Sequence, residues 1–556
     1  MDGREYRLRC YRRLLELEGE RKKGWEKHWK DLSRHFLPRR ARFLEAGERT
    51  NDGDEKNRLQ DDTGILAVRV LASGMQGGLT SPARPWFSLT LQDEDAARRE
   101  DARLWLHAVY ERMAAVFARS NFYDQIHMLY RELSVFGTGA MLVEEDAKSV
   151  VRCRTLTVGE YALDVDAAHR VDTLYRRVRM TPRQIAEAWP DTCPDGIRRM
   201  ADDARQDWLT LLHAVEPNPD HREGLARRQS RERPWRSVYM TLDRGGNGTL
   251  EDSGYYEFPA LCPRWNTTAS DIYGSSPAMD ALADCRMLQK MAEDGFLALE
   301  LEVKPPLLNF TNKEEIDVSP GAVANVASLA QGQQAIVPMY QVKANLRELE
   351  AAKDNIRRQI RTMLYNDLFM MVSGEDKRMT ATEVDARNTE KMLLLGPVID
   401  RLRSELFQPL IERVFGIMDR AGHIPPAPPE LEGRELKVEF TSILAQAQKA
   451  AGLNGVLQTF GVVAQAASVN PEVLDKFDMD EMVDQIAEMN GVPPRLIRSD
   501  EAVAELRARR KRQTEQTRML EMLRQGADTA KTGAEAAKAA GITPEALQTL
   551  ETKAQT

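Results

Sequence analysis

Three aspartates lying close together in the sequence could supply oxygen ligands for a metal ion. Asp164, Asp166 and Asp172 fall within a stretch of nine residues, and carboxylate oxygens are ligands that Mg²⁺ prefers. Such a cluster would suit a magnesium-dependent enzyme that processes nucleic acids. Aspartate is also common in turns between short strands, and this structural role is the one we favour. The enzyme remains an alternative function.

The motifs of several other enzyme classes do not occur in the sequence. It contains no GxxxxGK(S/T) segment to hold the phosphates of a nucleotide, no GxSxG elbow and no HExxH. Gly137-Thr138-Gly139 lacks a third glycine and follows a predicted helix, so we expect a turn there. His28 and His35 lie on an amphipathic helix and are expected to be structural. We therefore expect neither enzymatic activity nor a cofactor.

The cysteines give no sign of a zinc site or of a disulfide framework. They are odd in number, scattered and without a CxxC pair, which indicates a reducing compartment: Cys10, Cys153, Cys193, Cys262 and Cys285. No apolar run approaches the ~18 residues of a membrane span, and the charged start MDGREYRLRCYRR lacks the apolar stretch of a signal peptide. We expect a chain that is cytosolic when synthesised and does not contact a membrane.

Length and charge limit the possible architectures and partners. The 556 residues correspond to three or four domain-sized units at ~150 residues each. Hydrophobic residues make up 42% and charged residues 29%, as in soluble folded proteins. The formal net charge of −8 would repel free nucleic acid overall, so any contact with DNA must be local.

Hydrophobic periodicity predicts helices in the N-terminal third and strands after it. Four helical stripes and one alternating strand at 87–91 are indicated. From about 138 to 270 the segments shorten and Pro, Gly and Asp recur, which predicts an α+β arrangement. The four stripes are Trp25/Trp29/Leu32/Phe36, Val68/Leu71/Met75/Leu79, Leu106/Val109/Met113/Val116 and Ile126/Leu129/Leu133/Phe136.

Two long helices are predicted in the middle of the chain. Residues 276–302, opened by the cap Ser276-Pro277, would span ~40 Å, and residues 342–371 ~45 Å. Gly- and Pro-containing short strands between them predict two antiparallel rods with a small cap at their joined end. A third helix at 380–420 must kink, because it contains Pro397 and Pro409. Helix is expected again over 445–525, and disorder over 526–556.

Several segments resemble the head-to-tail connector, or portal, proteins of short-tailed bacteriophages. The resemblance covers about residues 5–515. The segments at 71–87 and 378–384 are specific in combination. The segments that carry the resemblance are LASGMQGGLTSPARPWF at 71–87, YGSSPAMDAL at 273–282, RMTATEV at 378–384, LGPVIDRL at 395–402, PLIERVF at 409–415 and ELKVEFTSILAQAQKA at 435–450.

The resemblance implies a mainly helical α+β portal fold that assembles as a ring. Its regions, carried over onto this sequence, are a wing, a stem, a clip, a tunnel loop, a crown and a flexible tail. They correspond to 1–275 (wing), 276–302 (first stem helix), 303–341 (clip), 342–371 (second stem helix), 372–379 (tunnel loop), 380–444 (wing, with the kinked bridging helix and a strand), 445–520 (crown) and 521–556 (tail).

Elementary geometry is compatible with such a ring. Twelve helices of ~10 Å side by side enclose a bore of roughly 28 Å, which admits duplex DNA. The first predicted rod with its flanks, 276–304, carries six acidic and three basic residues, and 342–371 carries six basic and four acidic residues. We expect acidic groups to dominate the bore, because a basic wall would bind DNA tightly and stall it.

Two charged segments are predicted to contact DNA without reading its sequence. The first is the tunnel loop, residues Gly374, Glu375, Asp376, Lys377 and Arg378, in which the two bases would touch phosphates; the alternative is a plain helix connection. The second is the basic run in the crown, for which a solvated helix face balanced by glutamates is the alternative; it comprises Arg507, Arg509, Arg510, Lys511 and Arg512.

The resemblance further implies a non-enzymatic role in the virion. Twelve copies would form the channel for packaging and ejecting double-stranded DNA at one capsid vertex. The ring would nucleate head assembly, dock the terminase and later hold the tail. Its partners would be the terminase, the major capsid and scaffolding proteins and the tail adaptor or nozzle proteins, first in the host cytoplasm and then in the virion. A structural adaptor without a channel is the remaining alternative.

Overall fold

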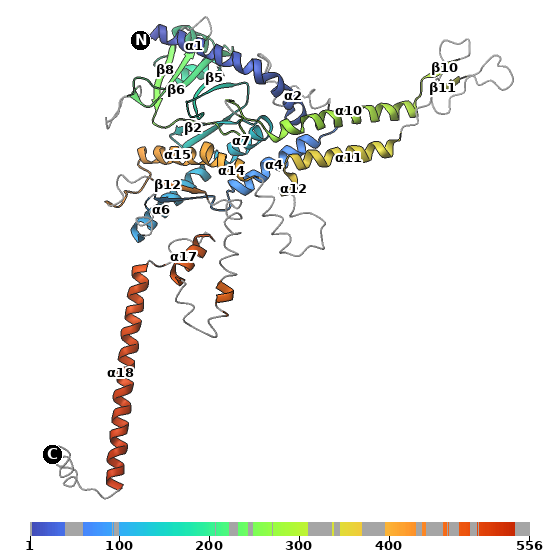
Figure 1. The fold of residues 1–556 in the computed structure, drawn as a ribbon. Helices are drawn as coiled ribbons and strands as arrows, with labels where there is room; N and C mark the ends of the chain where they lie inside the picture. Colours follow the sequence, from blue (N-terminus) through green and yellow to red (C-terminus); the bar gives the residue numbers. More distant parts are fainter. Residues whose placement is uncertain are drawn as a thin grey trace, which may run out of the picture. The chain divides into compact units, whose positions relative to one another are not determined.

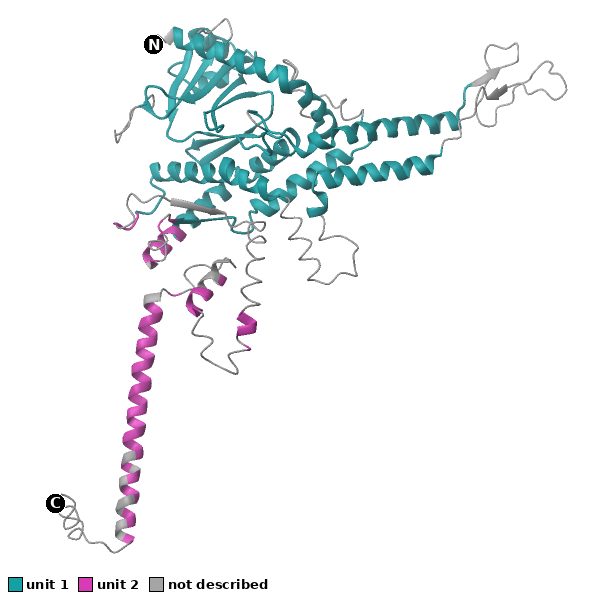
Figure 2. Cartoon of the chain, viewed as in Figure 1, with its two compact units in different colours: residues 1–90, 108–426, 436–457 teal, residues 91–107, 427–435, 458–556 magenta. Residues whose placement is uncertain are grey.

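The computed structural model describes most of the chain and divides it into two compact units (Figure 2). The first unit comprises 1–90, 108–426 and 436–457, and the second comprises 91–107, 427–435 and 458–556. The described residues are 3–38, 59–91, 93, 99–205, 207–221, 232–242, 248–268, 271–309, 336–338, 345–369, 395–429, 436–440, 460–463, 465, 478–489, 498 and 500–539.

The first unit begins with helices that cover a sheet. α1 (Gly3–Arg21) continues through a π turn, η1 (Lys22–Glu26), into α2 (Lys27–Phe36). One face of α1 packs on the sheet through four buried side chains, Tyr6, Cys10, Leu14 and Leu17. Three members of the predicted stripe, Trp29, Leu32 and Phe36, are buried on α2. The fourth, Trp25, lies in η1 and is half-buried.

The sheet beneath α1 is a five-stranded antiparallel meander (Figure 1). Its strands are β4 (Tyr161–Val165), β5 (Val171–Met180), β6 (Leu209–Pro217), β7 (Trp235–Thr241) and β8 (Thr249–Tyr255). Both faces are covered, because successive side chains of a strand point to opposite sides. Leu212 packs with α1, whereas Leu211 packs with Ile185 of α8 (Pro182–Ala188) and Ile197 of α9 (Asp195–Asp202).

A second, smaller sheet lies against helices of the same unit. β2 (Ala140–Asp146) pairs with β3 (Val150–Leu156) and with β9 (Ala260–Leu261), and α7 (Phe122–Phe136) contacts β2 and β3. α7 also packs against α4 (Thr63–Leu79). The stripes predicted for these two helices are buried. β1 (Phe87–Leu91) pairs with β12 (Leu436–Phe440), and α6 spans Glu100–Arg119.

Two long helices of the first unit run side by side away from the sheets (Figure 1). α10 spans Pro277–Val303 and α11 spans Leu346–Met363, with the short paired strands β10 (Leu307–Asn309) and β11 (Ile336–Pro338) between them in the chain. The prediction of one continuous helix over 342–371 is wrong at its end. Tyr365 has φ 55°, and a separate short helix, α12 (Asn366–Phe369), follows it.

The helix predicted over 380–420 begins, within the described residues, at α14 (Gly396–Leu402). It continues through a π turn, η5 (Arg403–Phe407), into α15 (Gln408–Arg420). Pro397 lies in the first turn of α14, where a missing N–H disturbs nothing. Pro409 is the second residue of α15, just after the π turn, and this wider turn accommodates the proline that a regular helix would exclude. A π turn thus interrupts the regular helix before Pro409, and the kink stays a prediction.

The second unit contains α17 (Met479–Met489) and a 40-residue helix, α18 (Asp500–Ala539). The expectation of disorder from residue 526 onward is wrong as far as Ala539, because the helix continues to that residue. In the described residues, no helix has both the length and the hydropathy needed to cross a bilayer.

Candidate functional site

The paired helices α10 and α11 are the most extended element of the first unit. α10 starts as predicted, with Ser276 accepting a hydrogen bond from the Met279 backbone N–H at 3.1 Å and Pro277 at its first position. Gly295 faces α11, and a Cβ at this position would lie 2.9 Å from Cδ2 of Leu349. Glycine therefore lets α10 approach the first turn of α11 closely.

Asp61 joins α10, α11 and α4. Its Oδ2 accepts hydrogen bonds from Nε and Nη2 of Arg357 on α11, at 2.9 and 2.8 Å. Gln289 of α10 donates to the Asp61 carbonyl at 2.6 Å, and Oδ1 accepts the N–H of Thr63 at the start of α4. Burial opposes ionisation of this carboxyl, but the hydrogen bonds from Thr63 and Arg357 outweigh it and lower its pKa.

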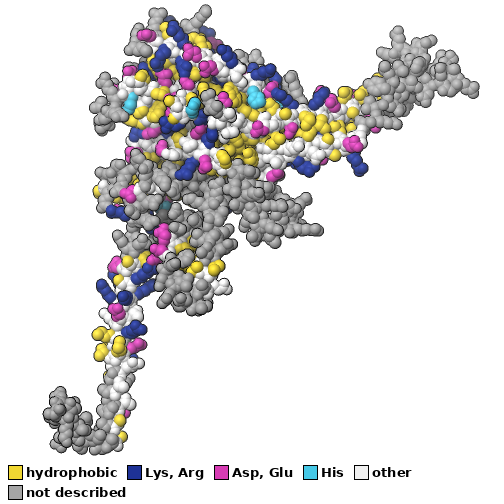
Figure 3. Space-filling view, in the orientation of Figure 1, with side chains coloured by type: hydrophobic (Ala, Val, Ile, Leu, Met, Phe, Trp, Pro, Cys, Tyr) yellow, Lys and Arg dark blue, Asp and Glu magenta, His cyan; other side chains and the backbone are white. Residues whose placement is uncertain are grey.

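Acidic and basic side chains both occur on the surface of the helix pair (Figure 3), and only some of them form ion pairs. On α10, Arg286 pairs with Asp31 at 2.7 Å and Lys290 with Asp294 at 2.9 Å. The acidic groups Glu300 and Glu302 near the end of α10 have no basic partner among the described residues. The far end of this helix therefore carries two acidic residues, Glu300 and Glu302, beside one exposed base, Lys304.

Gly74 fixes the short helix α12, which precedes the predicted tunnel loop. A Cβ at Gly74 of α4 would overlap the ring of Phe369, so the ring lies directly against the α4 backbone. Gly74 belongs to the segment 71–87, one of those that carry the resemblance to the connector family. The five loop residues proposed to contact DNA, Gly374 to Arg378, lie outside the described residues.

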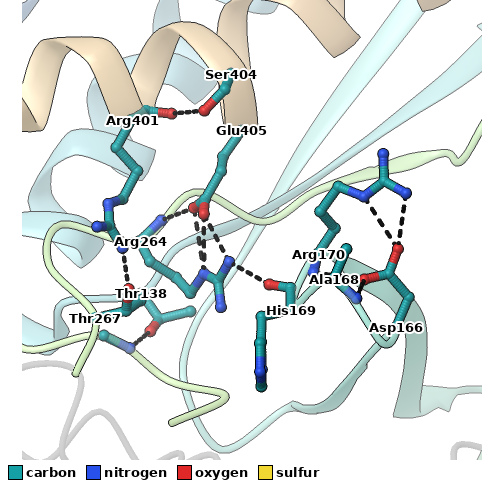
Figure 4. Close-up of polar contacts among 11 residues, drawn as sticks. Thr138, Asp166, Ala168, His169, Arg170, Arg264, Thr267, Arg401, Ser404 and Glu405 are labelled. Atoms are coloured by element: carbon teal, nitrogen blue, oxygen red, sulfur yellow. Dashed lines mark hydrogen bonds and ion pairs between the residues drawn. The ribbon is translucent and has the colours of Figure 1, made fainter. Parts of the chain in front are cut away.

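A buried ion pair holds the π turn of the α14–α15 helix (Figure 4). Arg264 follows β9, and its side chain is 6% exposed. Its Nη2 donates to Oε1 of Glu405 at 2.6 Å and to the His169 carbonyl at 2.8 Å, and its backbone N–H donates to Oε2 of Glu405 at 2.8 Å. The pair thereby connects η5 to the turn between β4 and β5.

The Gly137-Thr138-Gly139 segment, predicted to be a turn, connects α7 to β2: the chain bends at Gly137, and Thr138 forms a β-bridge with Arg264. Gly137 ends α7 with φ 71°, and its backbone lies so near Gly274 that a Cβ would overlap the Gly274 carbonyl. Thr138 accepts a hydrogen bond from the Gly274 N–H at 2.8 Å. These contacts hold the residues that lead into α10 against the end of α7.

The three aspartates of the alternative metal site have structural partners. Asp164 pairs with Arg13 of α1. Asp166 closes the β4–β5 turn by accepting backbone N–H groups of Arg170 and Ala168, which lower its pKa, while burial raises the pKa of Asp172. In the part of the chain that the structure describes, no three His, Cys, Asp or Glu side chains gather to hold a metal ion.

The predicted basic run lies on the first half of α18, and its members differ in their surroundings. Arg507 forms a two-point ion pair with Asp480 of α17, at 2.6 and 2.8 Å, and Arg509 pairs with Glu505 at 3.5 Å. The other three, Arg510, Lys511 and Arg512, are exposed and have no acidic partner among the described residues. They are available to an external anion.

All five cysteines are buried as free thiols. Burial, the largest cause, raises the pKa of Cys153 and of Cys285 to about 12. These thiols are therefore protonated at neutral pH, which makes them poor nucleophiles.

Sequence reasoning missed Asp61 and the Arg264–Glu405 pair. The paired residues 264 and 405 lie 141 positions apart, and no local motif marks either of them. Asp61 precedes a predicted helix and could have been recognised as a residue near its cap, but its contacts with α10 and α11 have no local signal.

Comparisons with known proteins agree with the resemblance of the sequence segments. The chain is 40% identical over 497 residues to the probable portal protein of Bordetella phage BPP-1, covering 88% of this chain and 89% of that protein. It is 37% identical over 512 residues to the portal protein of Salmonella phage epsilon15, covering 91% of each. A solved chain in the neck of an empty gene transfer agent particle aligns with 68% of this chain and 81% of its own length, at 12% identity and a TM-score of 0.34.

The family match extends over both compact units. Residues 8–497 match the family described as bacteriophage head to tail connecting protein. This range contains α10, α11, the Arg264–Glu405 pair and α17. The chain belongs to the bacteriophage head to tail connecting protein family.

Proposed function

We propose that twelve copies of this protein form a ring at one capsid vertex and that the ring is the channel for double-stranded DNA. The observation that carries the proposal is the α10–α11 pair, two long helices fastened side by side through Asp61. Copies of such a pair can stand next to one another around an axis. Closing a ring requires one face to meet a different face of the neighbour.

The charge pattern supports a channel through which DNA slides. Glu300 and Glu302 near the end of α10 have no ion-pair partner among the described residues, and the bases Arg286 and Lys290 earlier on this helix are paired with acids. Lys304 is the exposed base that follows them, so the described end of α10 keeps an excess of acidic groups. A duplex carries a negative charge every ~1.7 Å, so acidic groups facing it prevent tight binding. The wing, stem, clip and crown regions of the sequence analysis are part of this proposal.

The ring itself is tested by native mass spectrometry of the purified full-length chain. We expect a closed species of about twelve times the 63.0 kDa subunit mass, together with a ring seen by electron microscopy whose hole admits a duplex. A monomer would contradict the ring, and a hole narrower than a duplex would leave only a structural adaptor without a channel.

The tunnel loop is proposed to touch DNA phosphates through Lys377 and Arg378. Replacing both by alanine should leave ring assembly intact and lower the amount of genome packaged or retained per particle several-fold, because transient phosphate contacts are lost. The measurement is DNA content per purified particle. As a matched control, alanine at the exposed bases Lys148 and Arg183 removes the same charge elsewhere and should change nothing. Unchanged DNA content in the loop variant would contradict the assignment.

The wider role follows from membership of a structural family. The ring would nucleate head assembly, dock a terminase during packaging and hold tail adaptor or nozzle proteins afterwards. Capsid and scaffolding proteins would be its partners during assembly in the host cytoplasm. The bases Arg510, Lys511 and Arg512 on α18, which lack acidic partners among the described residues, are proposed to contact packaged DNA.

A DNA cleavage assay distinguishes the alternative function, a magnesium-dependent enzyme, from the proposed channel. Incubating duplex DNA with the protein and Mg²⁺ should leave the DNA uncut, since Asp164 and Asp166 are engaged with arginines and backbone N–H groups. Cleavage that disappears in Asp164→Ala and Asp166→Ala variants would support the enzyme instead.

A further inference from the structure

Three polar side chains form a line across the five-stranded sheet, on the face that also carries Leu211. Arg176 of β5, His213 of β6 and Tyr239 of β7 lie directly opposite one another in the strand register. His213 is fully buried, and Arg176 is 4% exposed. The imidazole lies flat on the Tyr239 ring, with 3.9 Å between the ring centroids and 5° between the planes. We call these three residues the polar ladder.

The hydrogen bonds of the polar ladder determine where His213 carries its proton. Nε of Arg176 donates to Nδ1 of His213 at 2.9 Å, and Nη2 of Arg176 donates to the Tyr239 hydroxyl at 3.2 Å. A guanidinium has only donors and stays charged, so Nδ1 must be the unprotonated nitrogen. The proton of the ring therefore lies on Nε2, which is 3.2 Å from Oγ of Ser237. In this arrangement the imidazole is neutral.

The surroundings of the polar ladder also disfavour a positive charge on His213. Burial, the largest cause, and the charges of Arg176 and Arg154 lower its pKa well below the ordinary value. α8 and α9 contribute apolar side chains to this face of the sheet. The other titratable groups near the polar ladder are adjacent to Tyr239 or Ser237: Glu144 of β2, Glu251 of β8, which accepts a hydrogen bond from Trp189 of α8 at 2.8 Å, and Tyr255 of β8.

We propose that His213 is a pH-sensitive switch whose protonation opens the sheet locally at β5, β6 and β7. A second proton can bind the ring only at Nδ1. The new N–H would point at the N–H of Arg176, so two donors and two positive charges would replace one hydrogen bond. Arg176 has no ion-pair partner among the described residues, and a buried charge without a partner is costly. The polar ladder must therefore open for the imidazolium to reach water.

The direction of the pH dependence follows from the protons that the two states bind. In the opened sheet, His213 takes up a proton near its ordinary pKa of 6.5, whereas the closed sheet excludes that proton. Acid therefore favours opening, and the effect is absent well above pH 6.5. Between pH 7 and pH 5 the equilibrium constant for opening should rise roughly 25-fold.

Hydrogen–deuterium exchange of the full-length chain, read by mass spectrometry, tests the switch without any substitution. After correction for the intrinsic effect of pH on amide exchange, peptides from β5, β6 and β7 should exchange roughly 25-fold faster at pH 5 than at pH 7. The reference is the α10–α11 pair, which contains no histidine and should keep its protection. Unchanged protection of β6 would overturn the proposal. An equal loss in α10 and α11 would also overturn it, because acid would then unfold the whole unit.

Two variants assign the effect to one histidine. His213→Asn keeps an oxygen that can accept from Arg176 but cannot take up a proton, so its exchange in β5–β7 should be the same at pH 5 and pH 7. The matched control is His169→Asn, at an exposed turn position with φ 58° that asparagine tolerates; it should keep the full pH effect. An effect that persists in His213→Asn, or disappears in His169→Asn, would contradict the switch. If His213→Asn does not fold, the exchange of the unsubstituted chain decides.

Discussion

Replacing Arg264 by methionine is expected to lower the free energy of unfolding by about 3–5 kcal/mol, the usual cost of removing one partner of a buried pair. Methionine keeps much of the side-chain length but leaves the Glu405 carboxylate without its guanidinium and the His169 carbonyl without its donor. The Glu405 side chain is only 20% exposed, so water compensates poorly for the loss. The measurement is the midpoint of urea unfolding of the purified chain.

Two further variants show whether burial of the pair is the cause. Arg286→Met removes an ion pair with Asp31 that consists of one contact at 2.7 Å. Arg286 is 50% exposed, so we expect a loss of less than about 1 kcal/mol. The double variant Arg264→Met with Glu405→Leu should recover much of the lost stability, because no buried charge is left uncompensated. A double variant less stable than Arg264→Met would contradict this explanation.

The second large effect is expected from Gly137→Ala, with a loss of about 2–4 kcal/mol. Gly137 has φ 71°, which is unfavourable for residues with a Cβ, and the new methyl group would overlap the carbonyl of Gly274. That carbonyl belongs to the segment leading into α10 and has little freedom to move. Thermal or urea unfolding measures the loss.

Gly422→Ala is the matched control for this substitution. Gly422 follows α15 with the same φ of 71°, but nothing lies within 4 Å of its hypothetical Cβ. We expect only the conformational cost there, about 1–2 kcal/mol. The difference between the two variants measures the backbone contact between Gly137 and Gly274. Equal losses would mean that this contact contributes nothing.

Helix positions could be predicted where the sequence has a long apolar stripe with helical spacing or a capping residue that marks the helix start. The start of α10 at Ser276-Pro277 and the buried stripes of α4 and α7 are cases in which local rules and tertiary packing agree. The end of α11 could not be predicted, because the residues 346–364, directly before Tyr365, contain no Gly or Pro that would mark a helix end. The Tyr365 ring lies near that of Trp265, a residue 100 positions away in the sequence.

The candidate site was predictable only in part. The basic run of α18 can be recognised in the sequence from its density of Arg and Lys. Only the structure distinguishes Arg507, which is bound to Asp480, from Arg510, which lacks an acidic partner among the described residues. The π turn before Pro409 could not be predicted from hydrophobic periodicity, because that analysis assumes the 3.6 residues per turn of a regular α-helix. The predicted disorder beyond residue 526 was wrong up to Ala539 because alanine, which adds little to a core, has the highest helix propensity, and six of the residues 526–539 are alanines.

The fastening of Asp61 has a mechanical consequence. The guanidinium of Arg357 donates to its carboxylate, and the side-chain amide of Gln289 donates to its carbonyl. The backbone N–H of Thr63, at the start of α4, donates to the same carboxylate. A force applied along either rod therefore reaches the other through Asp61 as well as through the direct contacts that α10, α11 and α4 make with one another. Sliding of one rod past the other would break the bonds of Asp61 to Arg357 or the bond to Gln289, so Asp61 resists such sliding.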